Sequence, residues 1–168
     1  MTPHIRPESP ADHPAIRLVN QRAFGGDSEA DLIEALRAQD FARLSLVAVV
    51  EDRVVGHILM SDLRIVTRTG TMAALALAPM AVLPEHQRRG IGSLLVREAL
   101  DESRCAGHKI VVVLGHADYY PRFGFSPELA QPLESPYAGP NFMALELQSG
   151  ALDGVQGRVE YAPPFTEL

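Results

Sequence analysis

Residues 82–93 read VLPEHQRRGIGS and join an apolar segment to an amphipathic helical segment. Gly90 and Gly92 allow a tight turn and a close approach of main-chain N–H groups to a ligand. The N–H groups that open a helix have no partner within it, and the helix dipole makes that end attract anions. Arg88 and Arg89 add positive charge beside this point. The stretch therefore predicts a binding site for a phosphate or pyrophosphate group.

The segments around this loop indicate alternating strands and helices. Residues 73–83 are almost wholly apolar, as in a strand covered on both faces, and Pro79 predicts a bulge there because proline cannot donate to a strand partner. Strands before and after a helix, with hairpins on one side, predict a mixed α/β sheet flanked by helices. We expect helices at 9–24, from residue 28 and at 92–104, strands at 44–50, 54–63, 73–83, 110–114 and 142–147, and a short helix or turn at 117–123.

Composition limits the class of protein. The chain has 168 residues, which suits one domain over residues 1–168, and its net charge of −6 argues against a nucleic-acid partner. One cysteine, Cys105, and no Cys/His cluster predict neither a disulfide nor a metal site. The longest apolar run is too short to span a bilayer, and the N-terminus lacks the pattern of a signal peptide. We therefore expect a cytoplasmic protein that does not bind membranes.

The spacing of the loop narrows the choice of phosphate ligand. A Walker loop needs a lysine directly after its last glycine, and here Ser93 follows Gly92. The Gly-x-Gly-x-x-Gly fingerprint of dinucleotide binding is also missing from the sequence. The alternative is the pyrophosphate of coenzyme A.

The run QRRGIG, residues 87–92, resembles the acyl-CoA loop Gln/Arg-x-x-Gly-x-Gly/Ala of the GCN5-related N-acetyltransferase (GNAT) superfamily. The order of elements is similar too, since an interrupted strand precedes the loop and a helix and a strand follow it. Residues 120–125, YPRFGF, then match the family's Tyr-x-x-x-Gly-Phe segment. The resemblance covers about residues 4–147, is strongest over 73–147, and looks most like the YhbS-type branch of the superfamily.

The resemblance implies a GNAT-like fold, in which a central, mostly antiparallel sheet with splayed fourth and fifth strands is flanked by helices. It also implies acetyl-CoA as the cosubstrate, with pantetheine in the gap between those strands and the diphosphate on the loop. The residues that it assigns to acetyl-CoA are Met80, Ala81, Val82, Gln87, Arg88, Arg89, Gly90, Ile91, Gly92 and Ser93.

The implied reaction is N-acetyl transfer, in which an amine attacks the thioester directly. Tyr120 matches the family's tyrosine acid. A phenol pKa of about 10 lies above a thiol pKa of about 8.5, so a tyrosine can protonate the departing thiolate. A backbone N–H near Val82 is expected to polarise the carbonyl oxygen.

The general base is less evident, because residues 75–82 and 110–114 contain none of the carboxylates that many relatives carry on these strands. His116 follows the second of these strands and has an intrinsic pKa suited to work near neutrality. Asp27 and Glu29 are expected to line the acceptor site, and a water relay is a further alternative. Glu85 lies in the acyl-CoA loop and faces the wrong ligand.

Other functions stay open. The missing strand carboxylate favours a GNAT module that senses acyl-CoA without turnover, whereas the Tyr120 segment argues against it. The loop does not distinguish acetyl from a longer acyl group, and only the arginines suggest a ribosome-associated protein. The sequence predicts structural roles for His57, as a partly buried histidine, and for Cys105 and His108, at a helix end.

The acceptor, a small-molecule or protein amine, is expected to meet three irregular segments. These are Phe24–Glu29, Arg64–Met72 and Ala130–Asn141. Family members often form homodimers, which makes a homodimer possible here as well.

Overall fold

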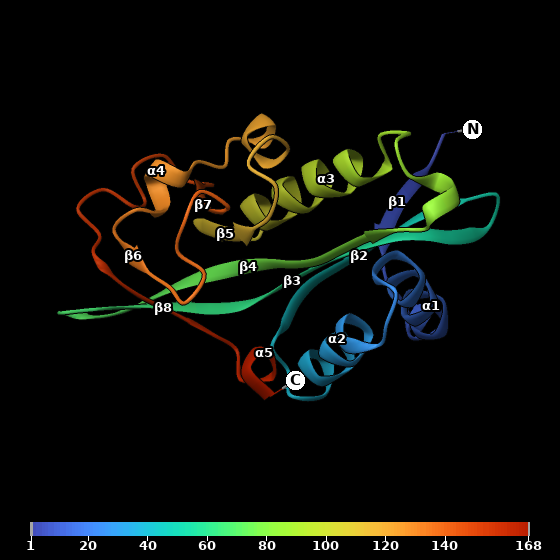
Figure 1. Ribbon diagram of the computed structural model, residues 1–168, viewed down its shortest axis with the longest axis horizontal. Coiled ribbons are helices and arrows are strands. Elements are labelled where there is room, and N and C mark those ends of the chain that lie inside the picture. The colour runs from blue at the N-terminus through green and yellow to red at the C-terminus, as the bar shows by residue number, and fades with distance from the viewer. Residues whose placement is uncertain (1, 168) are drawn as a thin grey trace.

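An open sheet of eight strands runs through residues 2–167, the part of the chain that the computed structural model describes (Figure 1). The strands are β1 (His4–Pro7), β2 (Ala42–Val50), β3 (Arg53–Thr67), β4 (Gly70–Val82), β5 (Ile110–Leu114), β6 (Leu133–Glu134), β7 (Phe142–Glu146) and β8 (Gly157–Tyr161). They follow the order β1-β2-β3-β4-β5-β7, and β8 pairs with both β3 and β6. Only β4 with β5 and β6 with β8 are parallel. The predicted mixed, mostly antiparallel sheet is therefore confirmed.

Helices cover both faces of the sheet (Figure 1). The chain has five α-helices and three short 3-10 helices over residues 2–167. They are η1 (Pro10–Asp12), α1 (His13–Phe24), α2 (Ser28–Ala38), η2 (Pro84–His86), α3 (Ile91–Cys105), η3 (Tyr120–Phe123), α4 (Pro127–Ala130) and α5 (Pro164–Glu167). In Figure 1, α1, α2 and α5 lie on one face and α3 lies on the other. The core is thus divided into layers above and below the sheet.

The apolar spacing of each long helix explains which face it buries. On α3, Leu95, Val96 and Ala99 recur at helical intervals and are fully buried against the sheet. On α1, Ile16 and Val19 do the same on the opposite face. Both helices therefore dock by one apolar stripe, as the sequence predicted.

Strand β4 carries the irregularity that Pro79 predicted. The pairing of β3 with β4 shifts register between Ile58 and Met60, so that Ala78 and Pro79 together face a single residue of β3. Beyond this point β4 also loses its other neighbour, because its pairing with β5 ends at Ala76. The C-terminal ends of β4 and β5 are therefore not paired with each other, which is the splaying expected from the family resemblance.

The hairpin between β3 and β4 differs from the sequence prediction. We expected an irregular link over Arg64–Met72, but β3 continues to Thr67 and β4 resumes at Gly70. The β-branched run at residues 65–67 favours an extended chain, and β8 pairs with this end of β3. The segment is therefore part of the sheet. Strands β1, β6 and β8 were not predicted.

A partly buried polar network joins the end of β1 to α1, α2, β2 and β3. The Glu8 carboxylate accepts hydrogen bonds from Arg37 Nε (2.9 Å) and from the Ser45 hydroxyl, and it contacts His13 Nε2 at 2.8 Å. Ser45 Oγ lies 2.8 Å from Nε2 of His57, a residue that is fully buried rather than partly buried as predicted. Burial raises the pKa of Glu8, but the neighbouring His57, 3.8 Å away, and the hydrogen bonds from Arg37 and Ser45 outweigh it and hold that pKa well below its usual range. The network fixes α1 and α2 on the sheet.

Candidate active site

A cavity of about 460 Å³ lies where β4 leads through residues 83–90 into α3. We call it the loop cavity. Every residue that the sequence assigned to acetyl-CoA lines it except Arg89, whose side chain is exposed outside it. The lining residues are Ala23, Phe24, Met80, Ala81, Val82, His86, Gln87, Arg88, Gly90, Ile91, Gly92, Ser93, Tyr119 and Arg122.

The start of α3 gives the loop cavity its affinity for anions. Gly90 caps the helix with a φ of 82°, a left-handed conformation that glycine adopts without strain. The first helical hydrogen bond runs from the Leu94 N–H to the Gly90 carbonyl (3.1 Å), so the N–H groups of residues 91–93 have no partner within the helix. Arg88 and Arg122 bring two positive charges to the same cavity. Sequence reasoning missed Arg122, although it lies in the YPRFGF segment.

The free edge of β4 offers main-chain groups to an extended ligand. The Leu83 N–H donates to the Val55 carbonyl of β3 (2.8 Å). In an antiparallel pair, residues alternate between facing the partner strand and facing away, so the main-chain groups of Val82 and Met80 face the gap beside β4. The Val82 carbonyl there accepts a hydrogen bond from Gln87 Nε2 (2.9 Å), which places the Gln87 amide within the loop. The N–H of Val82 and both main-chain groups of Met80 are thus turned toward the gap.

A second cavity of about 590 Å³ fills the space where β4 and β5 part. We call it the gap cavity. Its lining residues come from the end of α1, the start of α2, the second half of β4, the last residue of β5 and the segment that follows it. They are Phe24, Glu29, Leu32, Leu77, Ala78, Pro79, Met80, Leu114, Gly115, His116, Tyr119 and Tyr120.

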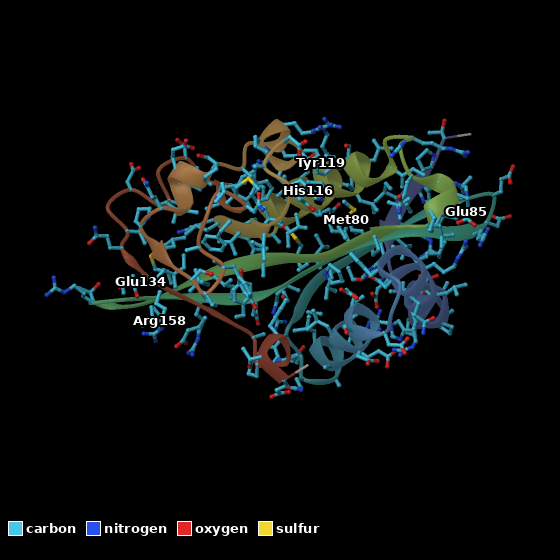
Figure 2. The ribbon with its side chains drawn as sticks, viewed as in Figure 1. Met80, Glu85, His116, Tyr119, Glu134 and Arg158 are labelled. Carbon is cyan, nitrogen blue, oxygen red and sulfur yellow. The ribbon has the colours of Figure 1, made fainter. Side chains whose placement is uncertain are left out.

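Tyr119 stands between the two cavities and lines both of them. Its hydroxyl lies 3.0 Å from Ser93 Oγ at the start of α3, and the Arg122 guanidinium lies 4.5 Å from the centre of its ring. Figure 2 shows Tyr119, His116 and Met80 close together on the same part of the molecule. Sequence reasoning chose Tyr120 by its place in the family pattern and missed the neighbouring tyrosine.

Tyr120 faces the gap cavity from a buried position. Its ring lies against Gly115 so closely that a Cβ on that glycine would approach Tyr120 Cε2 to 2.3 Å. Burial, and to a lesser extent Tyr119, raises the pKa of Tyr120 to about 12. The hydroxyl therefore stays protonated at neutral pH. His116 lies at the same cavity with an exposed side chain, so the two predicted catalytic residues share one cavity.

The acidic residues considered as bases lie in different places. Glu29 lines the gap cavity, whereas Asp27 points elsewhere and accepts a hydrogen bond from Gln21 Nε2 (2.8 Å). Glu85 forms an ion pair with Arg22 of α1 (2.8 Å), away from the other labelled residues of the site in Figure 2. Neither β4 nor β5 carries a carboxylate. Of the three acids, only Glu29 lines the gap cavity.

The other segments expected to meet the acceptor lie elsewhere. Neither Arg64–Met72 nor Ala130–Asn141 contributes a residue to the gap cavity. Arg64 instead lines a separate cavity beside Tyr137 and Tyr161, and Ala130 lines one beneath α4. Of the three segments, only Phe24–Glu29 contributes residues to the gap cavity. Cys105 is exposed at the end of α3.

Comparisons with known proteins identify the family of this chain. The sequence profile of the family described as "Acetyltransferase (GNAT) domain" matches residues 4–127. The N-acetyltransferase YhbS of Escherichia coli K12 is 34% identical over 167 residues, which cover 98% of this chain and 99% of that protein. The E. coli N-acetyltransferase YjhQ is 44% identical over 126 residues, or 74% of this chain and 68% of that protein.

Two solved structures resemble the fold over almost its whole length. The crystal structure of E. coli YhbS in complex with CoA has a TM-score of 0.90 at 33% identity, covering 99% of this chain and 93% of that one. A GNAT-family acetyltransferase from Brucella melitensis in complex with acetyl-CoA has a TM-score of 0.81 at 36% identity, covering 98% of both chains. Within residues 2–167, no helix is long and apolar enough to cross a membrane.

Proposed function

This chain belongs to the GNAT family of acetyltransferases, and we propose that it transfers an acetyl group from acetyl-CoA to an amine where its two cavities meet. The observation that carries the proposal is the shared wall. Phe24, Met80 and Tyr119 line both the loop cavity and the gap cavity, so the cavity at the start of α3 adjoins the cavity that Tyr120 lines. A cosubstrate with a pyrophosphate at one end and a reactive group at the other suits such a pair.

The loop cavity fits coenzyme A by its donors. The unpaired N–H groups of residues 91–93 would bind the pyrophosphate, with Arg88 and Arg122 balancing its charge. The main-chain N–H and carbonyl of Met80 would pair with the pantetheine amides as a further strand would. Acetyl-CoA, when bound, supplies the acetyl group as a thioester.

The chain's own residues would move the protons of the transfer. Tyr120 holds a proton on its hydroxyl at neutral pH, as its raised pKa requires, and would donate it in the gap cavity. His116 would act as the base. It would accept the proton that the amine loses, directly or through a water molecule, because its side chain is exposed at the gap cavity. The Val82 N–H would polarise the acetyl carbonyl. These roles, the cytoplasmic location and a homodimer remain predictions.

A thermal-shift titration with acetyl-CoA tests the binding step. At 100 times the dissociation constant, ligand binding contributes about 2.7 kcal/mol, which raises Tm by roughly 5–10 °C for a domain of this size. Replacing Gly92 with Leu should remove most of that shift, because a Cβ there already comes within 3.2 Å of Met80 Cε and 3.3 Å of the Tyr119 hydroxyl. Gly26→Leu is the matched control, since its Cβ would meet nothing within 4 Å.

The second measurement is CoA release in the presence of a panel of amines. Release that depends on amine supports an acetyltransferase. A thermal shift without release from any amine favours the alternative, a module that senses acyl-CoA. A thermal shift with a longer acyl-CoA but not with acetyl-CoA would mean that the acyl donor is the longer acyl-CoA. The absence of a thermal shift with either compound would overturn the proposal.

A further inference from the structure

The gap cavity has one carboxylate among its lining residues and neither lysine nor arginine. Glu29 supplies that carboxylate from the first turn of α2, and its side chain is half-buried. Apolar side chains make up most of the wall, chiefly Phe24, Leu32, Leu77 and Leu114. The proposed proton transfers use Tyr120 and His116 and leave Glu29 without a role.

Within residues 2–167, no cationic side chain pairs with Glu29. Arg17 of α1 pairs with Asp31 (2.8 Å) and with Glu34 (2.7 Å), and it also lies 3.8 Å from Asp27. Every other carboxylate along α2 and its N-cap is thus next to a cation. Glu29 forms neither an ion pair nor a hydrogen bond with any side chain of residues 2–167. A half-buried carboxylate without a partner is a natural binding site for a ligand's cation.

The apolar part of the cavity also lacks its partner. Phe24 and Leu114 are among the most exposed large hydrophobic side chains of the protein, at 45% and 49%, and both line this cavity. Exposed apolar surface that is gathered at a cavity marks a binding site more often than scattered apolar residues do. A ligand with a hydrocarbon body would cover these two side chains and bury their apolar surface.

Resting on the proposed acetyl transfer, we propose that the acceptor is an amine with an apolar body and a second, positively charged group that Glu29 binds. The attacking nitrogen must be neutral, so the charge at Glu29 belongs to another part of the molecule. That nitrogen forms a C–N bond to the acetyl carbon as the thioester C–S bond breaks. It loses one proton while the sulfur gains one, which gives an acetamide and a free thiol. A diamine or a basic side chain on an apolar scaffold meets these requirements.

Three probes of equal chain length isolate the charge at the far end. Hexamethylenediamine ends in an ammonium, hexylamine in a methyl group and aminocaproic acid in a carboxylate. A charge-assisted hydrogen bond contributes enough to change kcat/KM by roughly 10- to 100-fold. We expect kcat/KM to fall from the diamine to the monoamine by about this factor, and to fall again for the amino acid, whose carboxylate Glu29 repels.

Two substitutions at Glu29 make the test specific. Glu29→Gln should bring the diamine and the monoamine to similar values of kcat/KM, and Glu29→Lys should make aminocaproic acid the better acceptor. Glu34→Gln is the matched control, because Glu34 lies one turn further along α2 and pairs with Arg17 outside the cavity. It should leave the order of the three probes unchanged.

The possible results separate this inference from the acetyl transfer itself. Equal kcat/KM for all three probes, or an order that Glu29→Gln does not change, overturns the inference and leaves the acetyltransferase standing. Calorimetric titration of the diamine into the protein–CoA complex gives a readout without turnover. Binding that Glu29→Gln weakens by tenfold, but without acetylation, would support the cation site and overturn the transfer. If the diamine is neither bound nor acetylated, the cation site is overturned.

Discussion

The two cavities at the centre of this protein are built in different ways. The loop cavity is mainly the product of one continuous stretch, residues 80–93, and its donors are largely main-chain N–H groups at the start of α3 and along β4. The gap cavity collects side chains from α1, α2, β4 and the segment after β5. Main-chain donors depend on the path of the chain, whereas side-chain walls change with each substitution. Single substitutions should therefore alter the gap cavity more readily than the loop cavity.

The most severe test of this division is Tyr120→Phe. It removes the hydroxyl from the gap cavity and leaves the loop cavity untouched, so we expect kcat to fall by about 10²–10⁴-fold. The thermal shift produced by acetyl-CoA should stay the same. Steady-state kinetics and the acetyl-CoA titration check the two halves of the prediction.

Tyr119→Phe is the matched variant, because it removes a hydroxyl that contacts Ser93 instead. We expect it to keep most of the turnover. If Tyr119→Phe lost the turnover while Tyr120→Phe kept it, the acid would be Tyr119, and the family pattern would have pointed to the wrong tyrosine.

Sequence reasoning succeeded where function follows the path of the chain. The glycines of QRRGIG act on the backbone and predicted the anion site of the loop cavity, and Pro79 predicted the interruption of β4. The parting of β4 from β5 was expected from the family resemblance. Tyr119 and Arg122 were missed, since their contribution depends on how η3 lies against α3. Glu29 is left without an ion pair because Arg17 of α1 lies next to the three other carboxylates of this region, those of Asp27, Asp31 and Glu34. Only the packed arrangement shows it.

A smaller effect is expected from the Glu8 network, which holds α2 beside the gap cavity. Glu8 joins β1 to α2 through Arg37, and α2 carries Glu29 and Leu32. Glu8→Gln should lower the free energy of unfolding by about 2 kcal/mol, because it replaces charge-assisted hydrogen bonds by weaker ones. Tm should then fall by roughly 4–8 °C. We also expect the KM for an amine to rise more than the KM for acetyl-CoA. Glu98→Gln, at an exposed position of α3, is the control.

The pH dependence of this loss has a defined sign. The pKa of Glu8 is lowered in the folded protein, so its contribution to stability is present above the unfolded value of about 4.5 and is lost as the pH falls below it. The difference in Tm between the wild type and Glu8→Gln should therefore be largest near neutrality and shrink in acid. A difference that grew as the pH fell would contradict the role given to the Glu8 carboxylate.

The smallest effect is expected at the ion pair that links the two sides. Arg22 of α1 and Glu85 of η2 join the wall of the gap cavity to the loop cavity, but both side chains are about 40% exposed (39% and 43%). Exposed pairs contribute about 0–1 kcal/mol, so Arg22→Gln should change the KM for acetyl-CoA by less than about fivefold, and salt should abolish the difference. Arg43→Gln breaks a comparably exposed pair with Asp62 outside both cavities, and it should leave the KM unchanged. A tenfold rise that persisted in high salt would mean that α1 positions the acetyl-CoA loop, and the two cavities would then be one mechanical unit.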